Sequence, residues 1–165
     1  MIRPLSKADL PAVAALNNRY LGNGTMRLVP YLASDFLPYL PERKERYAMV
    51  VAVEDDQVVG FASIKPYSPR RGYYHAAENS VYLLPSRTGK GVGTALMKAI
   101  MQVALRLDYQ YLAAKIWTRN QGSIRFHERL GFTTVGQQRN IGFVDGEWIG
   151  TTIMEAILPE ILTEA

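Results

Sequence analysis

The feature that most constrains this chain is a β-rich run that stops at a proline and enters a helix through a glycine-rich turn. Residues 79–84 form the run and Pro85 ends it. The turn has three alternating glycines: Gly89, Gly91 and Gly93. Glycine lets the backbone approach a ligand because it has no Cβ, and the following helix points free N–H groups and its positive end into the turn. We therefore expect an anion site here, with added positive charge from Lys90 and Arg87.

The spacing of these glycines excludes two common phosphate-binding patterns. The Walker pattern needs four residues between its first glycine and a Gly-Lys-Ser/Thr triplet, and the chain has no such spacing. The dinucleotide pattern needs glycine or alanine at Thr94 or Leu96. A Gly-x-Gly-x-Gly turn before a helix remains. Taken alone, it fits a plain strand-to-helix connection as well as a ligand loop.

The composition narrows the classes of function. The chain has no cysteine, which excludes disulfides, thiolate metal sites and a cysteine nucleophile. Its two histidines are too few for a histidine-rich cluster, so we expect no metal. No apolar run approaches membrane-spanning length, and the basic residues are scattered despite the net charge of +4. We expect a cytoplasmic protein that binds neither membranes nor nucleic acid.

Hydrophobic periodicity predicts a single α/β domain over residues 1–165, with a mixed, mostly antiparallel sheet flanked by helices. The expected strands cover residues 2–5, 47–53, 58–65, 73–84, 111–117, 133–138 and 148–158. The expected helices begin near residues 8, 35, 92 and 120, and Gly131 ends the last of them. Turns at residues 54–57 and at Asp145-Gly146 join two pairs of strands into hairpins.

A second motif covers residues 120–132, which read Asn-Gln-Gly-Ser-Ile-Arg-Phe-His-Glu-Arg-Leu-Gly-Phe. Alone, it fits a helix that Asn120 caps and Gly131 ends. Together with the glycine turn, it resembles the GNAT superfamily of acyl-CoA-dependent N-acetyltransferases over nearly the whole chain. The resemblance implies the GNAT fold and acetyl-CoA as cosubstrate. The expected acetyl-CoA contacts are Val81, Tyr82, Leu83, Thr88, Gly89, Lys90, Gly91, Val92, Gly93, Thr94 and Asn120.

Within this superfamily, the chain most resembles the phosphinothricin and methionine sulfoximine acetyltransferase branch. The resembling stretches are residues 18–20 with Thr25, then 70–73, 78–82, 123–132 and 142–148. The chain departs from the superfamily at Thr88, where arginine or glutamine is usual. It departs from the branch at three positions that concern the acceptor: Ala76 in place of threonine, Val144 in place of lysine and Gly150 in place of aspartate.

Two residues are candidates for the proton transfers that acylation of an amine requires. An amine is protonated near neutral pH, so a base must take its proton, directly or through water. Glu78 shares a strand face with Tyr82, and the resemblance implies that it is this base; an ordinary surface carboxylate is the alternative. His127 lies on the apolar face of its helix beside Leu130, and the resemblance implies a proton-transfer role. A satisfied core histidine is the alternative there.

The remaining expected contacts follow from the resemblance. The oxyanion of the tetrahedral intermediate needs fixed donors, which the main chain at Val81, Tyr82 and Leu83 is implied to supply. Tyr82 fits a core aromatic residue equally well. The acceptor-binding segment is implied to be Arg71, Gly72 and Tyr73, where an arginine can pair with a carboxylate. A solvated arginine is the alternative at that position.

We therefore expect an N-acetyltransferase that moves the acetyl group of acetyl-CoA to a small amino-acid-like amine by direct attack on the thioester. The alternatives are another amine acceptor (a protein N-terminus, a polyamine or an aminoglycoside) and a non-catalytic acyl-CoA-binding module. A dense acidic cluster, which would suit polyamines and aminoglycosides, is missing from the expected pocket. The resemblance also implies a homodimer.

Overall fold

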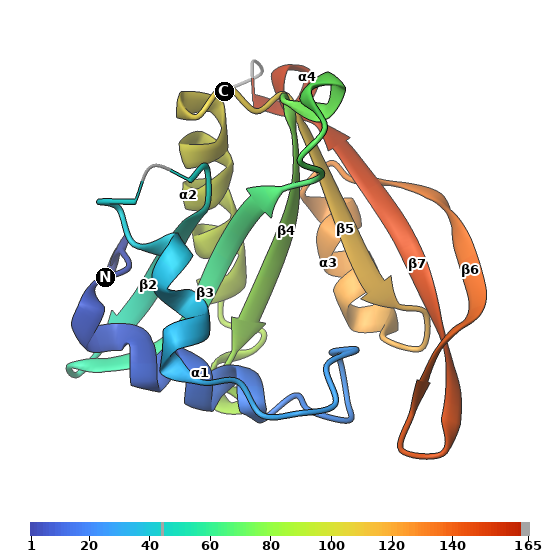
Figure 1. The fold of residues 1–165 in the computed structure, drawn as a ribbon, viewed down its shortest axis with the longest axis horizontal. Helices are drawn as coiled ribbons and strands as arrows, with labels where there is room; N and C mark the ends of the chain where they lie inside the picture. Colours follow the sequence, from blue (N-terminus) through green and yellow to red (C-terminus); the bar gives the residue numbers. More distant parts are fainter. Residues whose placement is uncertain (44, 163–165) are drawn as a thin grey trace.

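A single seven-stranded sheet organises the chain in the computed structural model, which describes residues 1–43 and 45–162 (Figure 1). The strand order is β1-β2-β3-β4-β5-β7-β6, and of the pairs in the described range the β4–β5 pair is parallel and the others antiparallel. The strands are β1 (Ile2–Pro4), β2 (Ala48–Glu54), β3 (Gln57–Pro66), β4 (Ala76–Leu83), β5 (Tyr111–Trp117), β6 (Thr133–Val144) and β7 (Glu147–Ile157). This confirms the expected mixed, mostly antiparallel α/β fold.

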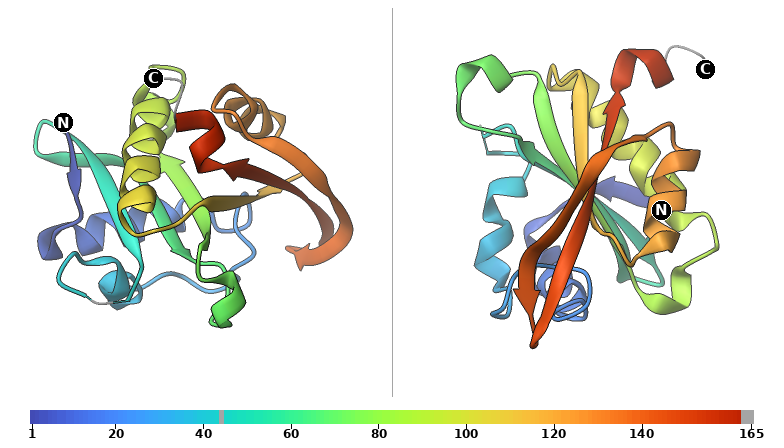
Figure 2. Two further views of the ribbon diagram at one scale, coloured as in Figure 1. Left: turned by 90° about the horizontal axis from the view of Figure 1, so that it is seen from above. Right: turned by 90° about the vertical axis from the view of Figure 1, so that its right-hand side faces the viewer.

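Helices cover both faces of the sheet. They are α1 (Leu10–Asn18), α2 (Val92–Arg106), α3 (Gln121–Arg129) and α4 (Leu158–Leu162), with 3₁₀ turns η1 (Lys7–Asp9), η2 (Ala33–Tyr39), η3 (Arg71–Tyr73) and η4 (Pro85–Arg87). Helices α2 and α3 lie on one face, and α1 lies on the other with η2 (Figure 2). No helix in residues 1–43 and 45–162 is both long and apolar enough to cross a membrane.

Strand β4 separates two cores by the alternation of its side chains. Ala77 is fully buried in the core that α2 covers, which also contains Leu96 and Ile100. Tyr82 packs into the core that α1 covers, beside Phe61. Odd-numbered residues of β4 therefore face α2, and even-numbered residues face α1.

The two expected hairpin turns are confirmed, and positive φ angles define both. Asp55 and Asp56 have φ of 49° and 60° between β2 and β3, and Asp145 and Gly146 have φ of 50° and 79° between β6 and β7. Two consecutive positive φ values are those of the type I′ turn, whose twist matches that of paired strands. Aspartate and glycine tolerate this conformation better than most residues.

Two boundaries differ from the expected ones by three residues or more. Residues 73–75 precede β4 because they lie in or beside a 3₁₀ turn. The main-chain carbonyls of Arg70 and Arg71 accept hydrogen bonds from the N–H groups of Tyr73 and Tyr74 there. Arg46 holds this turn by stacking on the Tyr74 ring at 3.7 Å and donating to its carbonyl. Strand β6 continues to Val144 instead of ending near residue 138, because register shifts let its irregular middle stay paired with β7.

The strands that frame the site diverge. The β4–β5 ladder contains three pairs and ends with Glu78 opposite Ala113. Beyond that pair the two strands separate toward their carboxyl ends (Figure 1). The main chain in the diverging part has no partner strand on the inner side, so polar backbone groups are available to a ligand there.

Candidate functional site

A cleft of about 960 Å³ lies where β4 and β5 diverge. The second half of β4 and the second half of β5 line it, together with the glycine turn and α3. Its lining includes Asn79, Ser80, Val81, Tyr82, Leu83, Ala114, Lys115, Ile116, Trp117, Asn120, Phe126 and His127. The cleft therefore contains both sequence motifs, which are far apart along the chain.

The glycine turn borders the cleft in the conformation that only glycine adopts readily. Gly89 and Gly91 have φ of 73° and 84°, and no atom beyond the adjoining residues lies within 4 Å of an ideal Cβ at either position. Gly91 caps the 15-residue helix α2, so the unpaired N–H groups of the first turn of α2 face this open space. The geometry suits an anion such as a phosphate.

Most of the residues expected to hold the cofactor line the cleft. In the turn these are Thr88, Gly89, Gly91, Gly93 and Thr94, and outside it Val81, Tyr82, Leu83 and Asn120. Two residues of the expected set do not line it: Lys90 is exposed, and Val92 packs against the main core. Arg87 is bound to the Glu54 carboxylate at 2.5 Å, which directs its charge away from the turn.

The main chain of β4 presents its polar groups to the cleft at alternate residues. The N–H of Leu84 donates to Val59 on β3, so even-numbered residues of this strand bond to β3. The N–H and C=O groups of Val81 and Leu83 consequently face the cleft. Of the three residues expected to supply donors, Tyr82 has its main chain committed to β3. The Leu83 carbonyl accepts the hydroxyl of Tyr20.

Asn120 caps α3 and lines the cleft. Its Oδ1 accepts the N–H of Ser123 at 3.1 Å and so caps α3, and the residue also lines the cleft. Gly131, with φ of 97°, ends the same helix as expected. Phe132 follows it into the core and contacts the ring of His127 edge-on at 5.0 Å.

His127 is buried with both ring nitrogens in contact with protein groups. Its Nδ1 lies 2.8 Å from the carbonyl of Ser123, which can only accept, so Nδ1 carries the proton. Its Nε2 lies 3.4 Å from Nδ2 of Asn79 and accepts from it. Burial lowers the pKa of His127, and the Ser123 carbonyl opposes that shift. The ring is therefore neutral near pH 7, with its lone pair on Nε2 at the cleft.

This burial predicts a pH-dependent stability. The pKa of His127 is lower in the folded chain than in the unfolded chain. As pH falls below about 6.5, the unfolded chain is therefore protonated at this residue while the folded chain is not. The free energy of unfolding should therefore decrease from about pH 7.5 to about pH 5, and by less in His127→Gln than in the wild type. Urea titrations of both proteins at each pH measure this difference. Parallel pH profiles for the two proteins would contradict the assignment.

Glu78 lies on the opposite side of β4, facing α1, and shares that face with Tyr82 as expected. Its carboxylate lies 3.4 Å from Nζ of Lys115, and its side chain is 19% exposed. Burial raises the pKa of the neighbouring Tyr39 and Tyr82, and the Glu78 charge adds to this effect. Glu78 and His127 thus flank the diverging strands from opposite faces of the sheet.

The expected acceptor-binding segment lies in η3, outside the lining of the cleft. Arg71 and Gly72 are exposed. Tyr73 contacts Tyr67 with ring centroids 5.4 Å apart, and Lys115 lies 5.9 Å from the Tyr67 ring. The segment is therefore connected through Tyr67 to the face on which Glu78 lies.

Sequence reasoning missed three residues of this site: Asn79, Lys115 and Tyr20. Asn79 is a polar residue inside an apolar strand pattern, and Lys115 interrupts the apolar run Leu-Ala-Ala-Lys-Ile-Trp, so both carried a visible signal. Asn79 is buried, and its Oδ1 has no hydrogen-bond partner in the described part of the chain. Tyr20 lies in a stretch that resembles the branch, but its contact with Leu83 spans 63 residues and leaves no local signal.

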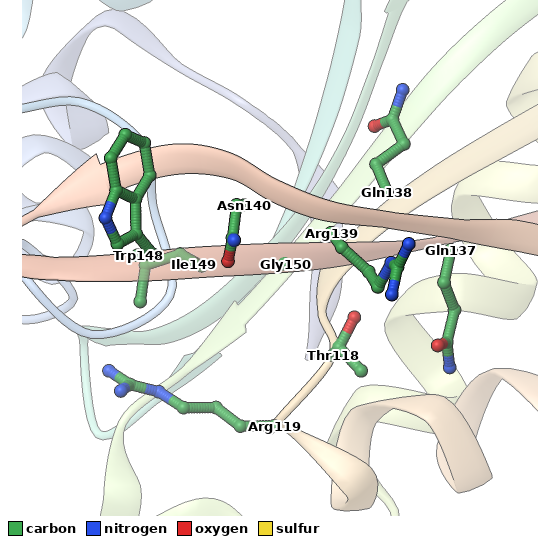
Figure 3. A pocket seen from close by; sticks show the side chains of 9 residues that line it. All are labelled: Thr118, Arg119, Gln137, Gln138, Arg139, Asn140, Trp148, Ile149 and Gly150. Atoms are coloured by element: carbon green, nitrogen blue, oxygen red, sulfur yellow. The ribbon is translucent and has the colours of Figure 1, made fainter.

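A second hollow of about 910 Å³ lies beside the cleft, between the β5–α3 connection and the β6–β7 hairpin (Figure 3). Thr118 and Arg119 line it from one side, and Arg139 and Trp148 from the other. It lacks a helix N-terminus and a glycine turn. We therefore assign the chemistry to the cleft between β4 and β5.

The two hairpin positions that depart from the branch pattern pack tightly. Val144 is buried against Trp117 and Ile149. A Cβ at Gly150 would lie 3.1 Å from the carbonyl of Gln138, so an aspartate there would need the hairpin to shift. No group of three or more potential ligands that could hold a metal occurs in residues 1–43 and 45–162.

Comparisons with known proteins extend these observations. A model of the acetyltransferase (GNAT) family matches residues 12–132. The chain is 32% identical over 158 residues to the L-methionine sulfoximine/L-methionine sulfone acetyltransferase of Pseudomonas aeruginosa, covering 93% of this chain and 92% of that protein.

Two solved structures share the fold. A GNAT superfamily phosphinothricin acetyltransferase from Sinorhizobium meliloti, in complex with AcCoA, has a TM-score of 0.87 and 28% identity, covering 94% of this chain and 86% of that one. The ribosomal-protein-alanine N-acetyltransferase from Brucella melitensis has a TM-score of 0.88 and 30% identity, covering 95% and 99%. Sequence and fold thus agree over nearly the whole chain.

Proposed function

Because this chain belongs to the GNAT family of acetyltransferases, we propose that it acetylates the amine of a small amino-acid-like acceptor of the methionine sulfoximine or phosphinothricin type. Acetyl-CoA is the donor, as the family and the AcCoA-bound relative indicate. The observation that carries the proposal is the end of the β4–β5 ladder at Glu78, beyond which the strands open into a cleft that the glycine turn borders. We take residues 1–165 as one catalytic domain.

The glycine turn binds the pyrophosphate of acetyl-CoA in this proposal. The N–H groups at the start of α2 donate to the phosphate oxygens, and Gly89 and Gly91 let the main chain approach them. The pantetheine arm then lies along the cleft past Asn120 and between the diverging strands. The N–H groups of Val81 and Leu83 face the thioester and stabilise the oxyanion that forms on its carbonyl.

The reaction is a direct transfer with two proton movements. Glu78 takes one proton from the acceptor's ammonium group, and the neutral nitrogen then attacks the thioester carbon. The carbon–sulfur bond breaks and CoA leaves as a thiolate. His127, whose neutral Nε2 can accept a proton, takes the second proton from the nitrogen and delivers it to the sulfur. No covalent enzyme intermediate is needed.

The acceptor enters on the face of the sheet that α1 covers, where Glu78 lies. Arg71, Gly72 and Tyr73 form the outer border of this entrance, where the exposed charge of Arg71 attracts an anionic acceptor from solution before it binds. The proposal places one carboxylate, that of Glu78, at the acceptor amine. One carboxylate suits an acceptor with a single amine better than a polyamine or an aminoglycoside, which carry several positive charges.

Release of free CoA thiol across a panel of amines tests the proposed function. We expect rapid release with methionine sulfoximine, methionine sulfone or phosphinothricin, and slow release with spermidine or an aminoglycoside. A peptide with an N-terminal alanine belongs in the panel because of the similar structure from Brucella melitensis. Release with that peptide and with none of the amino-acid analogues would overturn the proposed acceptor and favour a protein N-terminus.

We further propose that the chain forms a homodimer through the β6–β7 hairpin. Four large apolar side chains of this hairpin are more than half exposed: Val135, Ile141, Phe143 and Trp148. Phe143 and Trp148 contact each other with ring centroids 4.9 Å apart. Exposed apolar clusters of this kind are typical of protein interfaces.

The dimer predicts a mass near twice 18.5 kDa in solution by light scattering. The variant Trp148→Glu should shift the mass to that of one chain, because a charge cannot be buried in the interface without a partner. Lys98→Glu, a charge change on the exposed side of α2, is the matched control and should remain dimeric. Wild-type protein with the mass of one chain, at all concentrations tested, would contradict the dimer.

A further inference from the structure

Lys115 is placed beside the proposed base of the reaction. Its Nζ lies 3.4 Å from Oε2 of Glu78. Among residues 1–43 and 45–162, it is the one basic group within ion-pair distance of this carboxylate. The two side chains differ in exposure, with 49% for Lys115 and 19% for Glu78. The lysine is therefore the more exposed partner and is accessible to a ligand.

The position of Lys115 follows from the strand register. Ala113 is opposite Glu78 in the last pair of the β4–β5 ladder. Lys115 lies two residues further along β5, on the same face as Ala113 and in the part where the strands have separated. Its ammonium group therefore reaches the base from the open side of the cleft, the side from which an acceptor must come.

The same strand face has a second polar group beside the cleft. Trp117 follows Lys115 by two residues and also lines the cleft. Its indole N–H is buried and has no hydrogen-bond partner in the described part of the chain. Buried donors are nearly always paired in folded proteins. This face of β5 therefore carries two polar groups, those of Lys115 and Trp117, in the part where the strands have separated.

We propose that Lys115 binds the α-carboxylate of the acceptor and so restricts the enzyme to α-amino acids. The inference rests on the proposed function and names the side chain that recognises the class of acceptor. An α-amino acid carries an ammonium and a carboxylate group joined through one carbon atom. When such an acceptor lies beside the Glu78–Lys115 pair, each of its charged groups can face a side chain of opposite charge. The ammonium lies at Glu78 and the carboxylate at Lys115.

The same arrangement explains how the base becomes available. In the free enzyme, Lys115 occupies one oxygen of Glu78. An amine without a carboxylate must compete with the Lys115 ammonium group for Glu78, and it offers Lys115 no other anionic partner. A carboxylate-bearing acceptor gives Lys115 a new partner, and Glu78 is then free to take the proton. Selectivity against amines without a carboxylate follows from this exchange.

The test compares two acceptors that differ only in the carboxylate: methionine sulfone and the amine obtained by its decarboxylation. In the wild type, kcat/KM should be higher for the amino acid. In Lys115→Met, kcat/KM for the amino acid should fall by about ten- to a hundred-fold, mainly through KM, as expected for loss of a charged hydrogen bond. The kcat/KM of Lys115→Met for the decarboxylated amine should stay within about two-fold of the wild-type value or rise.

Three variants complete the design. Lys115→Arg should restore most of the lost preference, because it keeps the charge. Lys98→Met, on the exposed side of α2, should match the wild type with both acceptors. The KM for acetyl-CoA should not change in any of them. If Arg71→Met loses the preference for the amino acid over the decarboxylated amine and Lys115→Met keeps it, η3 binds the carboxylate and the inference is wrong.

Other outcomes also separate this inference from the proposed function. If Lys115→Met loses activity equally with both acceptors, the lysine acts on Glu78 alone and the inference is wrong, while the function stands. If the wild type acetylates both acceptors equally well and Lys115→Met changes neither rate, the inference is again wrong. If the wild type acetylates none of methionine sulfone, methionine sulfoximine and phosphinothricin, the proposed function fails and the inference falls with it.

Discussion

Glu78→Gln should lower kcat by about 10²- to 10⁴-fold, the usual contribution of a general base. The amide keeps the shape of the side chain at the end of the β4–β5 ladder but cannot take a proton from the acceptor. Because Glu78 lies on the face opposite α2 and the glycine turn, acetyl-CoA should bind the variant as tightly as it binds the wild type. Steady-state kinetics and calorimetric titration with acetyl-CoA measure the two quantities separately.

A control for this variant is available on the same face of the sheet. Glu155 pairs with Ala113 from β7, and its carboxylate accepts the hydroxyl of Tyr111 at 2.9 Å. Glu155→Gln removes a carboxylate from this face without changing the proposed base, and we expect a rate close to that of the wild type. A kcat of Glu78→Gln within about two-fold of the wild type at every pH would exclude Glu78 from the mechanism.

Gly91→Val should abolish measurable binding of acetyl-CoA. Gly91 has φ of 84° at the cap of α2, and a β-branched residue is a strong outlier in that conformation. The valine side chain would also fill the open space that we assign to the phosphates, since no protein atom beyond the adjoining residues lies within 4 Å of its Cβ position. Calorimetric titration with acetyl-CoA should therefore show no saturation at concentrations that saturate the wild type.

The control for backbone strain is Gly146→Val. Gly146 has φ of 79° and equally open space around its Cβ position, but it lies in the β6–β7 turn. This variant carries a similar conformational cost away from the cofactor turn, so it should lose stability and keep its affinity for acetyl-CoA. Gly91→Val protein that is folded and binds acetyl-CoA with unchanged affinity would contradict the cofactor assignment.

Local sequence patterns predicted the elements whose signals are local. Both type I′ turns were visible, Asp55-Asp56 and Asp145-Gly146, and the bounds of β5 agree with the expected residues 111–117. The start of β4 was predicted too early. Residues 73–75 have aromatic side chains typical of a strand, but contacts with the distant Arg46 stabilise a turn there. Such tertiary contacts leave no local signal.

The candidate site was predicted in part for the same reason. The glycine turn and the helix from Asn120 carry motifs, so the cofactor side of the cleft could be located residue by residue. The acceptor side depends on the point at which β4 and β5 separate, which strand patterns do not encode. The pairs Glu78–Lys115 and Asn79–His127 form near this point, so they could be identified only in the structure.

The most direct test of this account is the mass spectrum of the product formed from acetyl-CoA and methionine sulfoximine by the purified wild-type chain. We expect a product heavier by one acetyl group on its α-amino nitrogen, released together with one equivalent of free CoA. Glu78→Gln protein should form it far more slowly under the same conditions. Turnover of acetyl-CoA with a peptide N-terminus, and no acetylated product from methionine sulfoximine, methionine sulfone or phosphinothricin, would contradict the central claim.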